Sequence, residues 1–217
     1  MRKTFLAITL FLAFSKAALA QFGNCTASEM RTYVDSATGN TITMLTDTMK
    51  NDRFLYQTDP MWTADGKYLL FRSSSRGNDK EVESTLPNGE KRKWTPTQIY
   101  FIEMATGKII QATEGPNLGS AFLANKTNRM FVSRKEKENW NMYVMDLDKF
   151  FADVKQGKIG KPSAYETFIG TFPTEMGRPG GYAVDCNDDY AYITVEREGT
   201  EEEKERMMKN AFLPESN

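Results

Sequence analysis

The stretch Pro60-Met61-Trp62-Thr63-Ala64-Asp65-Gly66-Lys67-Tyr68-Leu69-Leu70-Phe71-Arg72-Ser73 decides the fold of this chain. Asp65-Gly66 is a tight-turn dipeptide, because glycine accepts positive φ angles. The residues on both sides of the turn are β-formers. The stretch therefore predicts a hairpin with one strand at 59–63 and the next at 68–73.

This hairpin pattern returns twice in weaker form. Residues 128–134 repeat it 62 positions later (134 − 72 = 62), and residues 188–194 repeat it 60 positions after that (194 − 134 = 60). A second hairpin motif, with Thr38-Gly39 at its turn, is echoed by Thr106-Gly107, 68 positions on (107 − 39 = 68). Two different hairpins that alternate at a long period indicate a repeat architecture, and four strands per unit are typical of a propeller blade.

We therefore predict an all-β fold in which residues 30–217 form a partial, open β-propeller of about two and a half to three four-stranded blades, with short helical inserts. The outer half of a blade spans 30–46, complete blades span 56–113 and 119–169, and a partial blade spans 181–217. Closed propellers have at least four blades, and an open one exposes strand edges. We expect missing blades or another chain to close the ring, this chain being the N-terminal part of a larger propeller or a truncated gene product.

The other elements follow from local pattern. Further strands are expected at 98–104, 108–113, 121–124, 129–134, 141–146, 164–169, 181–184 and 190–195. Helical spacing predicts a helix at 200–212, and the apolar, turn-poor segment 148–154 before Gly157 predicts a second, short one. In the polar loop 74–97, Pro87-Asn88-Gly89 is typical of a small hairpin tip. We interpret Lys91-Arg92-Lys93 as a solvated cluster rather than a dedicated anion site.

Residues 1–20 have the pattern of a secretory signal peptide. A charged start is followed by an apolar run from Phe5 to Phe14 and by the small-residue site Ala18-Leu19-Ala20. Cleavage after Ala20 would leave 21–29 as a short polar leader and place the protein in the periplasm or outside the cell. The alternative is a buried N-terminal helix. The segment is too short for a membrane span, and no later stretch predicts one.

Charge and cysteine content limit the partners and the covalent structure. Without Arg2, Lys3 and Lys16 the chain has 25 basic residues (28 − 3) against 29 acidic ones, a net charge of −4. This balance argues against nucleic acid as a partner. Cys25 and Cys186 could form a disulfide in an oxidising compartment, and the alternative is two buried free thiols.

Basic residues recur at the same position of successive repeats. The second strand of each predicted blade ends in or near an arginine. In the last repeat the arginine is shifted by one or two residues. Further basic residues follow shortly after the strand ends. The set comprises Arg72, Arg76, Arg134, Lys135 and Arg197. Such a row suits an acidic oligosaccharide, because arginine can hold a carboxylate by two parallel hydrogen bonds. The alternative is that these arginines form ion pairs between blades.

Aromatic residues accompany the basic row, but no catalytic set does. Trp94 and Trp140 fall in the same loops and could stack on sugar rings. The chain has no histidine, so the usual acid–base or metal-ligand set is absent. No nucleophile elbow or phosphate-binding loop occurs either. We therefore assign no catalytic residue, metal site or cofactor to this chain.

The repeats resemble a known family. Asp35-Ser36-Ala37-Thr38-Gly39, Trp62-Thr63-Ala64-Asp65-Gly66-Lys67-Tyr68-Leu69-Leu70-Phe71 and Ile99-Tyr100-Phe101-Ile102-Glu103-Met104-Ala105-Thr106-Gly107 are similar to the TolB-like propeller repeat. Within that superfamily the order of elements, over about 30–194, most resembles the oligogalacturonate lyases of pectin-degrading bacteria. This resemblance implies a seven-bladed propeller that cleaves galacturonate oligomers by β-elimination with a divalent metal, manganese, held by histidines of later blades. Those histidines have no counterpart here.

Three functions remain open from the sequence. The first is the N-terminal portion of an exported lyase, inactive as this chain. The second is a non-catalytic TolB-like module that binds an acidic glycan or a protein. The third is the propeller of a prolyl-oligopeptidase-type enzyme. The signal peptide and the basic row support an exported protein with an acidic carbohydrate ligand.

Overall fold

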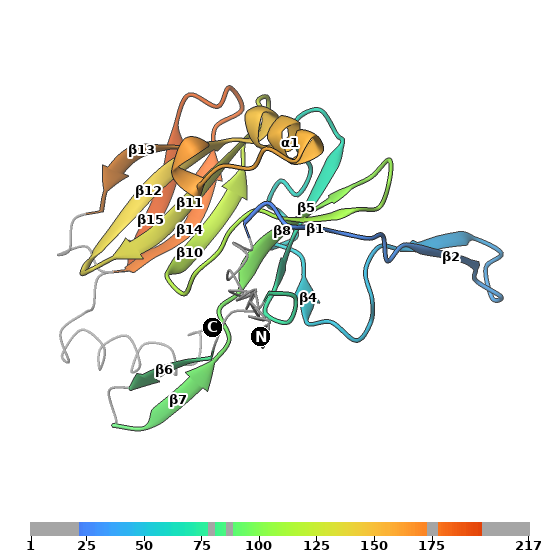
Figure 1. Ribbon diagram of the computed structural model, residues 1–217, viewed down its shortest axis with the longest axis horizontal. Helices are drawn as coiled ribbons and strands as arrows, with labels where there is room; N and C mark the ends of the chain where they lie inside the picture. Colours follow the sequence, from blue (N-terminus) through green and yellow to red (C-terminus); the bar gives the residue numbers. More distant parts are fainter. Residues whose placement is uncertain (1–21, 78–80, 86–88, 173–177, 197–217) are drawn as a thin grey trace, which may run out of the picture.

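The computed structural model describes residues 22–77, 81–85, 89–172 and 178–196. Within these ranges the chain is built mainly of antiparallel strands, with one α-helix and one short 3-10 helix (Figure 1). The predicted all-β class is therefore confirmed. The signal peptide predicted at 1–20, the helix predicted at 200–212 and the end of the partial blade lie outside the described residues.

Fifteen strands and two helices make up the described chain. The strands are β1 (Cys25–Thr26), β2 (Arg31–Val34), β3 (Thr41–Met44), β4 (Asp52–Arg53), β5 (Tyr68–Ser73), β6 (Val82–Thr85), β7 (Lys91–Trp94), β8 (Gln98–Glu103), β9 (Ile109–Gln111), β10 (Leu118–Leu123), β11 (Arg129–Glu136), β12 (Asn139–Asp146), β13 (Glu166–Thr171), β14 (Arg178–Val184) and β15 (Ala191–Glu196). The helices are α1 (Leu147–Gln156) and η1 (Pro162–Ala164).

The strands form three packed sheets and two hairpins. The first sheet has the order β1-β9-β8-β5-β4, the second has β10-β11-β12-β13, and the third consists of β14 and β15. The N-terminal hairpin, β2-β3, and the protruding hairpin, β6-β7, each form a separate two-stranded sheet. Figure 1 shows the N-terminal hairpin at one end of the molecule and the second and third sheets at the other.

Most predicted strands are found close to their expected positions, but the inner strand at 59–63 is reduced to a short segment, in which the Leu70 amide donates to Met61 and the Thr63 amide to Tyr68. β4 pairs with β5 at Arg53 and Arg72, whereas Trp62 forms an isolated bridge with Leu69. An unbroken antiparallel register would place residue 56 opposite Leu69, so the chain makes a six-residue excursion (62 − 56 = 6) between the two contacts. The inner edge of the first sheet is therefore shared between two short segments.

The leader predicted at 21–29 is not a separate polar segment. Cys25 and Thr26 pair with β9 as the outer edge of the first sheet, and Phe22 is buried in the core. The possible disulfide is also absent, since Cys25 and Cys186 are both unpaired and exposed. Cys25 belongs to the first sheet and Cys186 to the turn of the third sheet, with the second sheet between them.

The main core lies between the first and second sheets. Tyr68, Leu70 and Phe101 of the first sheet meet Leu123, Met130 and Val132 of the second. α1 closes one end of this core, where the Phe151 ring stacks on Tyr68 with centroids 3.6 Å apart. Lys155 of α1 also reaches Glu103 of the first sheet, with the charged atoms 3.0 Å apart. The helix thus joins the two sheets.

The sequence specifies both ends of α1. The Asp146 side chain caps the first turn by accepting a hydrogen bond from the Lys149 amide at 3.0 Å. Gly157 ends the helix with φ +65°, a conformation that favours glycine. Leu147, Phe150 and Phe151 form its buried face. The helix predicted at 148–154 is confirmed and is slightly longer.

The inner turns of the first and second sheets are each bound by an Asn or Asp side chain of the next sheet. The Asp65 amide of the first sheet donates to the Asn128 side chain of the second, at 3.2 Å. The amides of Asn125, Lys126 and Thr127 donate to the Asp188 carboxylate of the third sheet, at 2.7–2.8 Å. We call these contacts the Asn128 latch and the Asp188 latch.

No helix among the described residues is both long enough and apolar enough to cross a membrane.

Candidate functional site

Arg76, a predicted binding residue, lies in an internal ion-pair cluster. Its guanidinium donates to Glu29 at 2.9 and 2.6 Å and to Asp52 at 2.8 and 2.5 Å. The Arg76 side chain is only 7% exposed. The hydrogen bond from Arg76 lowers the pKa of Glu29 to about 2. Burial opposes the charge of Arg76, but hydrogen bonds from the arginine to Glu29 and Asp52 raise its pKa overall. Arg76 therefore forms ion pairs, as the alternative expected, but its partner Asp52 lies on β4 of the first sheet and not in another blade.

Arg134 is engaged in the same way. It forms a bidentate pair with Glu166, with both N–O distances 2.6 Å, and the Glu166 side chain is 4% exposed. Lys135 is more exposed and lies 3.8 Å from Glu138. Arg197 lies outside the described residues. The structure therefore does not bring Arg72, Arg76 and Arg134 together into one basic row.

Arg72 lies instead in a pocket of about 360 Å³ between the first and second sheets. We call it the arginine pocket. Residues from β4, β5 and β7 line one side, and Pro116, Leu118 and Gly119, at or just before the start of β10, line the other. Its polar lining includes Asn51, Arg53, Arg72, Ser74, Trp94 and Thr97. Among the described residues that line it, none is acidic.

Sequence reasoning missed Arg53, the second arginine of this pocket. Arg53 and Arg72 are direct cross-strand partners in the antiparallel pair of β4 and β5, so their side chains project from the same face. Like charges placed opposite each other across two strands destabilise a sheet. Neither arginine has an ion-pair partner among the described residues. A pair of exposed guanidinium groups held side by side is suited to bind an anion.

The two tryptophans have different positions. Trp94 ends β7, is 37% exposed and lines the arginine pocket. Trp140 lies on β12 against Gly119, where a Cβ atom would come within 2.6 Å of its ring. Gly119 lines the pocket, so Trp140 supports the wall and only Trp94 faces the cavity. The predicted tryptophan platform is therefore a single ring.

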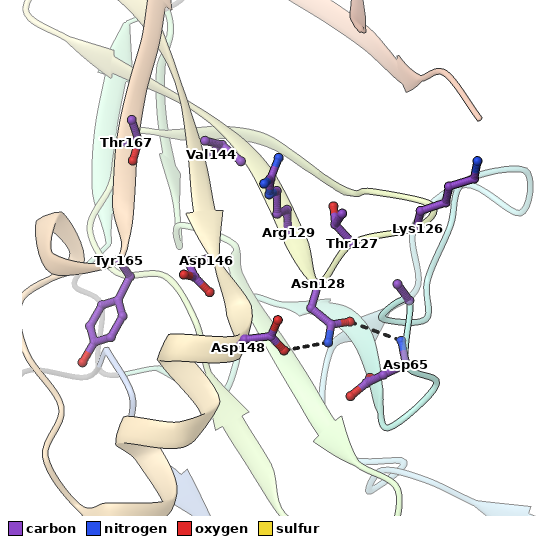
Figure 2. Close-up of a pocket in the computed structure, with 11 residues that line it drawn as sticks. Asp65, Lys126, Thr127, Asn128, Arg129, Val144, Asp146, Asp148, Tyr165 and Thr167 are labelled. Carbon is purple, nitrogen blue, oxygen red and sulfur yellow. Dashed lines mark hydrogen bonds between the residues drawn. The ribbon is translucent and has the colours of Figure 1, made fainter. Parts of the chain in front are cut away.

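A larger pocket of about 780 Å³ lies between the Asp65 turn and the start of α1. Figure 2 shows Asn128 between Asp65 and Asp148, with hydrogen bonds of 3.2 and 2.7 Å. Burial favours the neutral form of Asp65, but hydrogen bonds from Lys67 and Thr63 hold its pKa at about 2. Asp146 caps α1. Because these carboxylates already hold the fold together, this pocket is a weaker candidate for binding or catalysis.

The described residues contain no cluster of three or more His, Cys, Asp or Glu side chains that could hold a metal ion. Manganese, which the resemblance implies for the whole family, therefore has no set of ligands in this part of the chain. No step of a metal-dependent reaction can be derived from it.

Comparison with known proteins gives a likeness in fold. No family model matches the sequence. No curated protein matches it either. A solved structure described as oligogalacturonate lyase in complex with manganese matches with a TM-score of 0.53 and 20% identity, over 77% of this chain and 36% of that one. Oligogalacturonate lyase from Vibrio parahaemolyticus matches with a TM-score of 0.52 and 21% identity, over 76% of this chain and 35% of that one.

These matches support the predicted propeller-like fold. This chain spans only about a third of the length of either solved structure. At this level of sequence identity the similarity supports a shared fold but gives no information about activity. The described sheets therefore share the fold of part of the oligogalacturonate lyase structures.

Proposed function

We propose that this chain is the N-terminal, carbohydrate-binding portion of an exported propeller protein related to oligogalacturonate lyases, with two and a half to three blades that further strands must complete. The observation that carries the proposal is the pairing of Arg53 with Arg72 in a pocket whose described lining has no acidic residue. The ligand would be an acidic oligosaccharide of uronate type. Export rests on the sequence of 1–20.

The chemistry of the pocket matches such a ligand. Each guanidinium can hold one carboxylate through two parallel hydrogen bonds, and the bound anion would offset the repulsion between the two arginines. Trp94 offers an exposed ring on which a sugar face can stack. The Asn51 side chain donates to Ser74 at 2.8 Å, so a polar rim is already in place for hydroxyl groups.

A non-catalytic binding module is the second candidate. The full sequence has no histidine, and the described part of the chain has no metal-ligand cluster. Both observations favour binding without β-elimination by this chain alone. We expect no unsaturated product, followed by ultraviolet absorbance, when the chain is incubated with galacturonate oligomers and manganese. Product formation above a blank would overturn the non-catalytic assignment.

The binding proposal is tested by calorimetric titration of the mature chain with trigalacturonate at low salt. Arg53→Gln and Arg72→Gln should each weaken binding about tenfold, because each removes a charge-assisted contact of about 1.5 kcal/mol. Trp94→Ala should weaken it less. Added salt should weaken binding to the wild type, because the contact is ionic.

Two controls separate the pocket from general attraction between charges. Arg31→Gln removes the same charge from the N-terminal hairpin, at a residue that does not line the pocket, and should leave the affinity unchanged. Maltotriose, a neutral trisaccharide, should not bind. Equal affinity for both sugars, or equal losses in Arg31→Gln and Arg72→Gln, would contradict the proposal.

A further inference from the structure

The second sheet is covered unevenly on the side that faces the third sheet. β14 and β15 pack on Phe122, Phe131 and Met142. Beyond β15 an apolar groove of about 420 Å³ remains, with Val144 and Ile169 of the second sheet along it. Ile169 is 51% exposed. The groove continues the interface that β14 and β15 already make.

The third sheet has only the inner half of a repeat among the described residues. Its turn is closed by the Asp185 amide donating to the Tyr190 carbonyl at 3.0 Å. The Thr63–Tyr68 and Ala124–Arg129 contacts close the inner turns of the first two sheets in the same way, both at 3.0 Å. In those sheets two outer strands follow, β8-β9 and β12-β13, whereas β15 pairs only with β14 in the described chain.

The N-terminal hairpin is an outer half without an inner one. Its turn is closed by the Gly39 amide donating to the Asp35 carbonyl at 2.8 Å, as the Gly107 amide donates to Glu103 at 2.7 Å between β8 and β9. Both glycines have positive φ, +73° and +69°. β2 and β3 thus correspond to β8 and β9. Both strands pair only with each other among the described residues.

We propose that the N-terminal hairpin of a second copy of this chain adds to β15 and completes the third sheet, in the order β14-β15-β2-β3. β14 and β15 correspond to the two inner strands of a four-stranded repeat, and β2 and β3 correspond to its two outer strands, so together they make one complete repeat. Unpaired strand edges with exposed apolar residues are the usual template for such pairing. Val34, 65% exposed, would then cover the groove.

The pairing proposed here is between molecules, because the hairpin and β15 of one described chain lie apart. Within one chain the first and second sheets lie between the N-terminal hairpin and β15 (Figure 1). The base of the hairpin is also fixed to the first sheet, because the Asp47 amide donates to Glu29 at 2.8 Å and Glu29 pairs with Arg76. The hairpin therefore projects outward from an anchored base (Figure 1). Each copy offers one donor and one acceptor, so the association is head to tail.

The internal repeat also fixes the register. Leu69 pairs with Ile102 in the first sheet. The equivalent positions are Ala191 on β15 and Val34 on β2, so these two residues should lie opposite each other. Tyr33 should then lie opposite Tyr192, an aromatic cross-strand pair. Both tyrosines are at least half exposed in the single chain, at 50% and 58%.

The first test measures mass by light scattering across a dilution series of the mature chain. We expect the mass to rise above that of the monomer with concentration. Val34→Lys, which places a charge in the groove, should shift the association to higher concentration by at least tenfold. Met49→Lys, at a position 86% exposed outside the proposed interface, should behave as the wild type. A monomer at every concentration would overturn the proposal.

The second test identifies the contact. In a background with Cys25→Ser and Cys186→Ser, a Val34→Cys chain is mixed with an Ala191→Cys chain under oxidising conditions. We expect a disulfide-linked dimer on a non-reducing gel, and much less from Val34→Cys mixed with Thr194→Cys. Association without the Val34–Ala191 cross-link would show that another surface joins the copies, and would overturn the assignment of the hairpin.

Discussion

The two faces of the second sheet are covered differently. Toward the first sheet, sixteen buried residues form one cluster that includes the aromatic rings of α1. Toward the third sheet, the corresponding cluster has four buried residues among those described. The third sheet has a longer inner hairpin than the first, so the smaller cluster reflects the outer strands and the helix that the first two sheets contribute to the main core. A repeat of this kind is therefore stabilised mainly by what lies beyond its inner hairpin.

The largest effect should come from truncating one aromatic residue on each face. Phe150→Ala should lower the free energy of unfolding by about 4 kcal/mol, because the ring is fully buried and touches Phe22, Phe151 and Tyr165. Phe122→Ala should cost less, about 3 kcal/mol, because its buried ring packs on Phe131 and Tyr182 in the smaller cluster. Urea denaturation followed by tryptophan fluorescence measures both.

A matched control for these variants is Met49→Ala, which should leave unfolding unchanged because the side chain is 86% exposed. Equal losses of unfolding free energy in Phe150→Ala and Phe122→Ala would show that the two faces of the second sheet contribute equally to stability. That result would contradict the difference inferred from the sizes of the two buried clusters.

The Asp188 latch should contribute less, and its loss should be local. Asp188→Ala removes an acceptor that binds three backbone amides and the Thr127 hydroxyl, at a cost of about 2 kcal/mol. Hydrogen exchange should quicken in β14 and β15 and stay unchanged in β8. Asp188→Asn keeps an acceptor at a residue with φ +64°, which asparagine tolerates, and should recover most of the protection.

The smallest effect is a difference in pH dependence between the two latches. Burial opposes the charge of Asp188, but hydrogen bonds from Asn125, Lys126 and Thr127 lower its pKa below the usual 3.8. A lowered pKa means that the latch stabilises the fold above about pH 4 and is lost as the pH falls through the folded value. The Asn128 amide does not titrate in this range.

Hydrogen exchange across an acid titration checks this difference. Protection of β14 and β15 should fall below pH 4 before that of β8. Asp185, in the same turn, also has a lowered pKa, chiefly through the Tyr190 amide, so Asp188→Asn is needed to isolate the latch. Exchange in β14 that is equally acid-sensitive in the wild type and in Asp188→Asn would assign the effect to Asp185 instead.

Much of the fold could be predicted because turn chemistry and strand pattern agree locally. The Asp65-Gly66 turn and the run of β-formers around Phe71 placed β5 correctly, and the apolar, turn-poor segment 148–154 indicated α1. The excursion after Arg53 could not be predicted, because pairing across the sheet, not local pattern, decides where an inner strand is interrupted. The burial of Phe22 depends in the same way on distant partners.

The site was predicted only in part. Arg72 was identified from its place in the repeat, and it does line a pocket. Arg76 and Arg134 occupy similar stations, but nearby carboxylates, Glu29 and Glu166, bind them internally. Sequence position alone does not reveal which arginine forms an ion pair with a carboxylate in the folded protein. Arg53 was missed because its strand has two residues, too few to show a pattern.

Arg53 and Arg72, placed opposite each other across two strands, lower the stability of the sheet and at the same time form the proposed binding site. Two guanidinium groups facing each other weaken the empty sheet, and a neutral residue at either position would suit the fold better. A variant selected only for thermal resistance would therefore tend to lose one arginine, and with it the proposed binding of an acidic ligand.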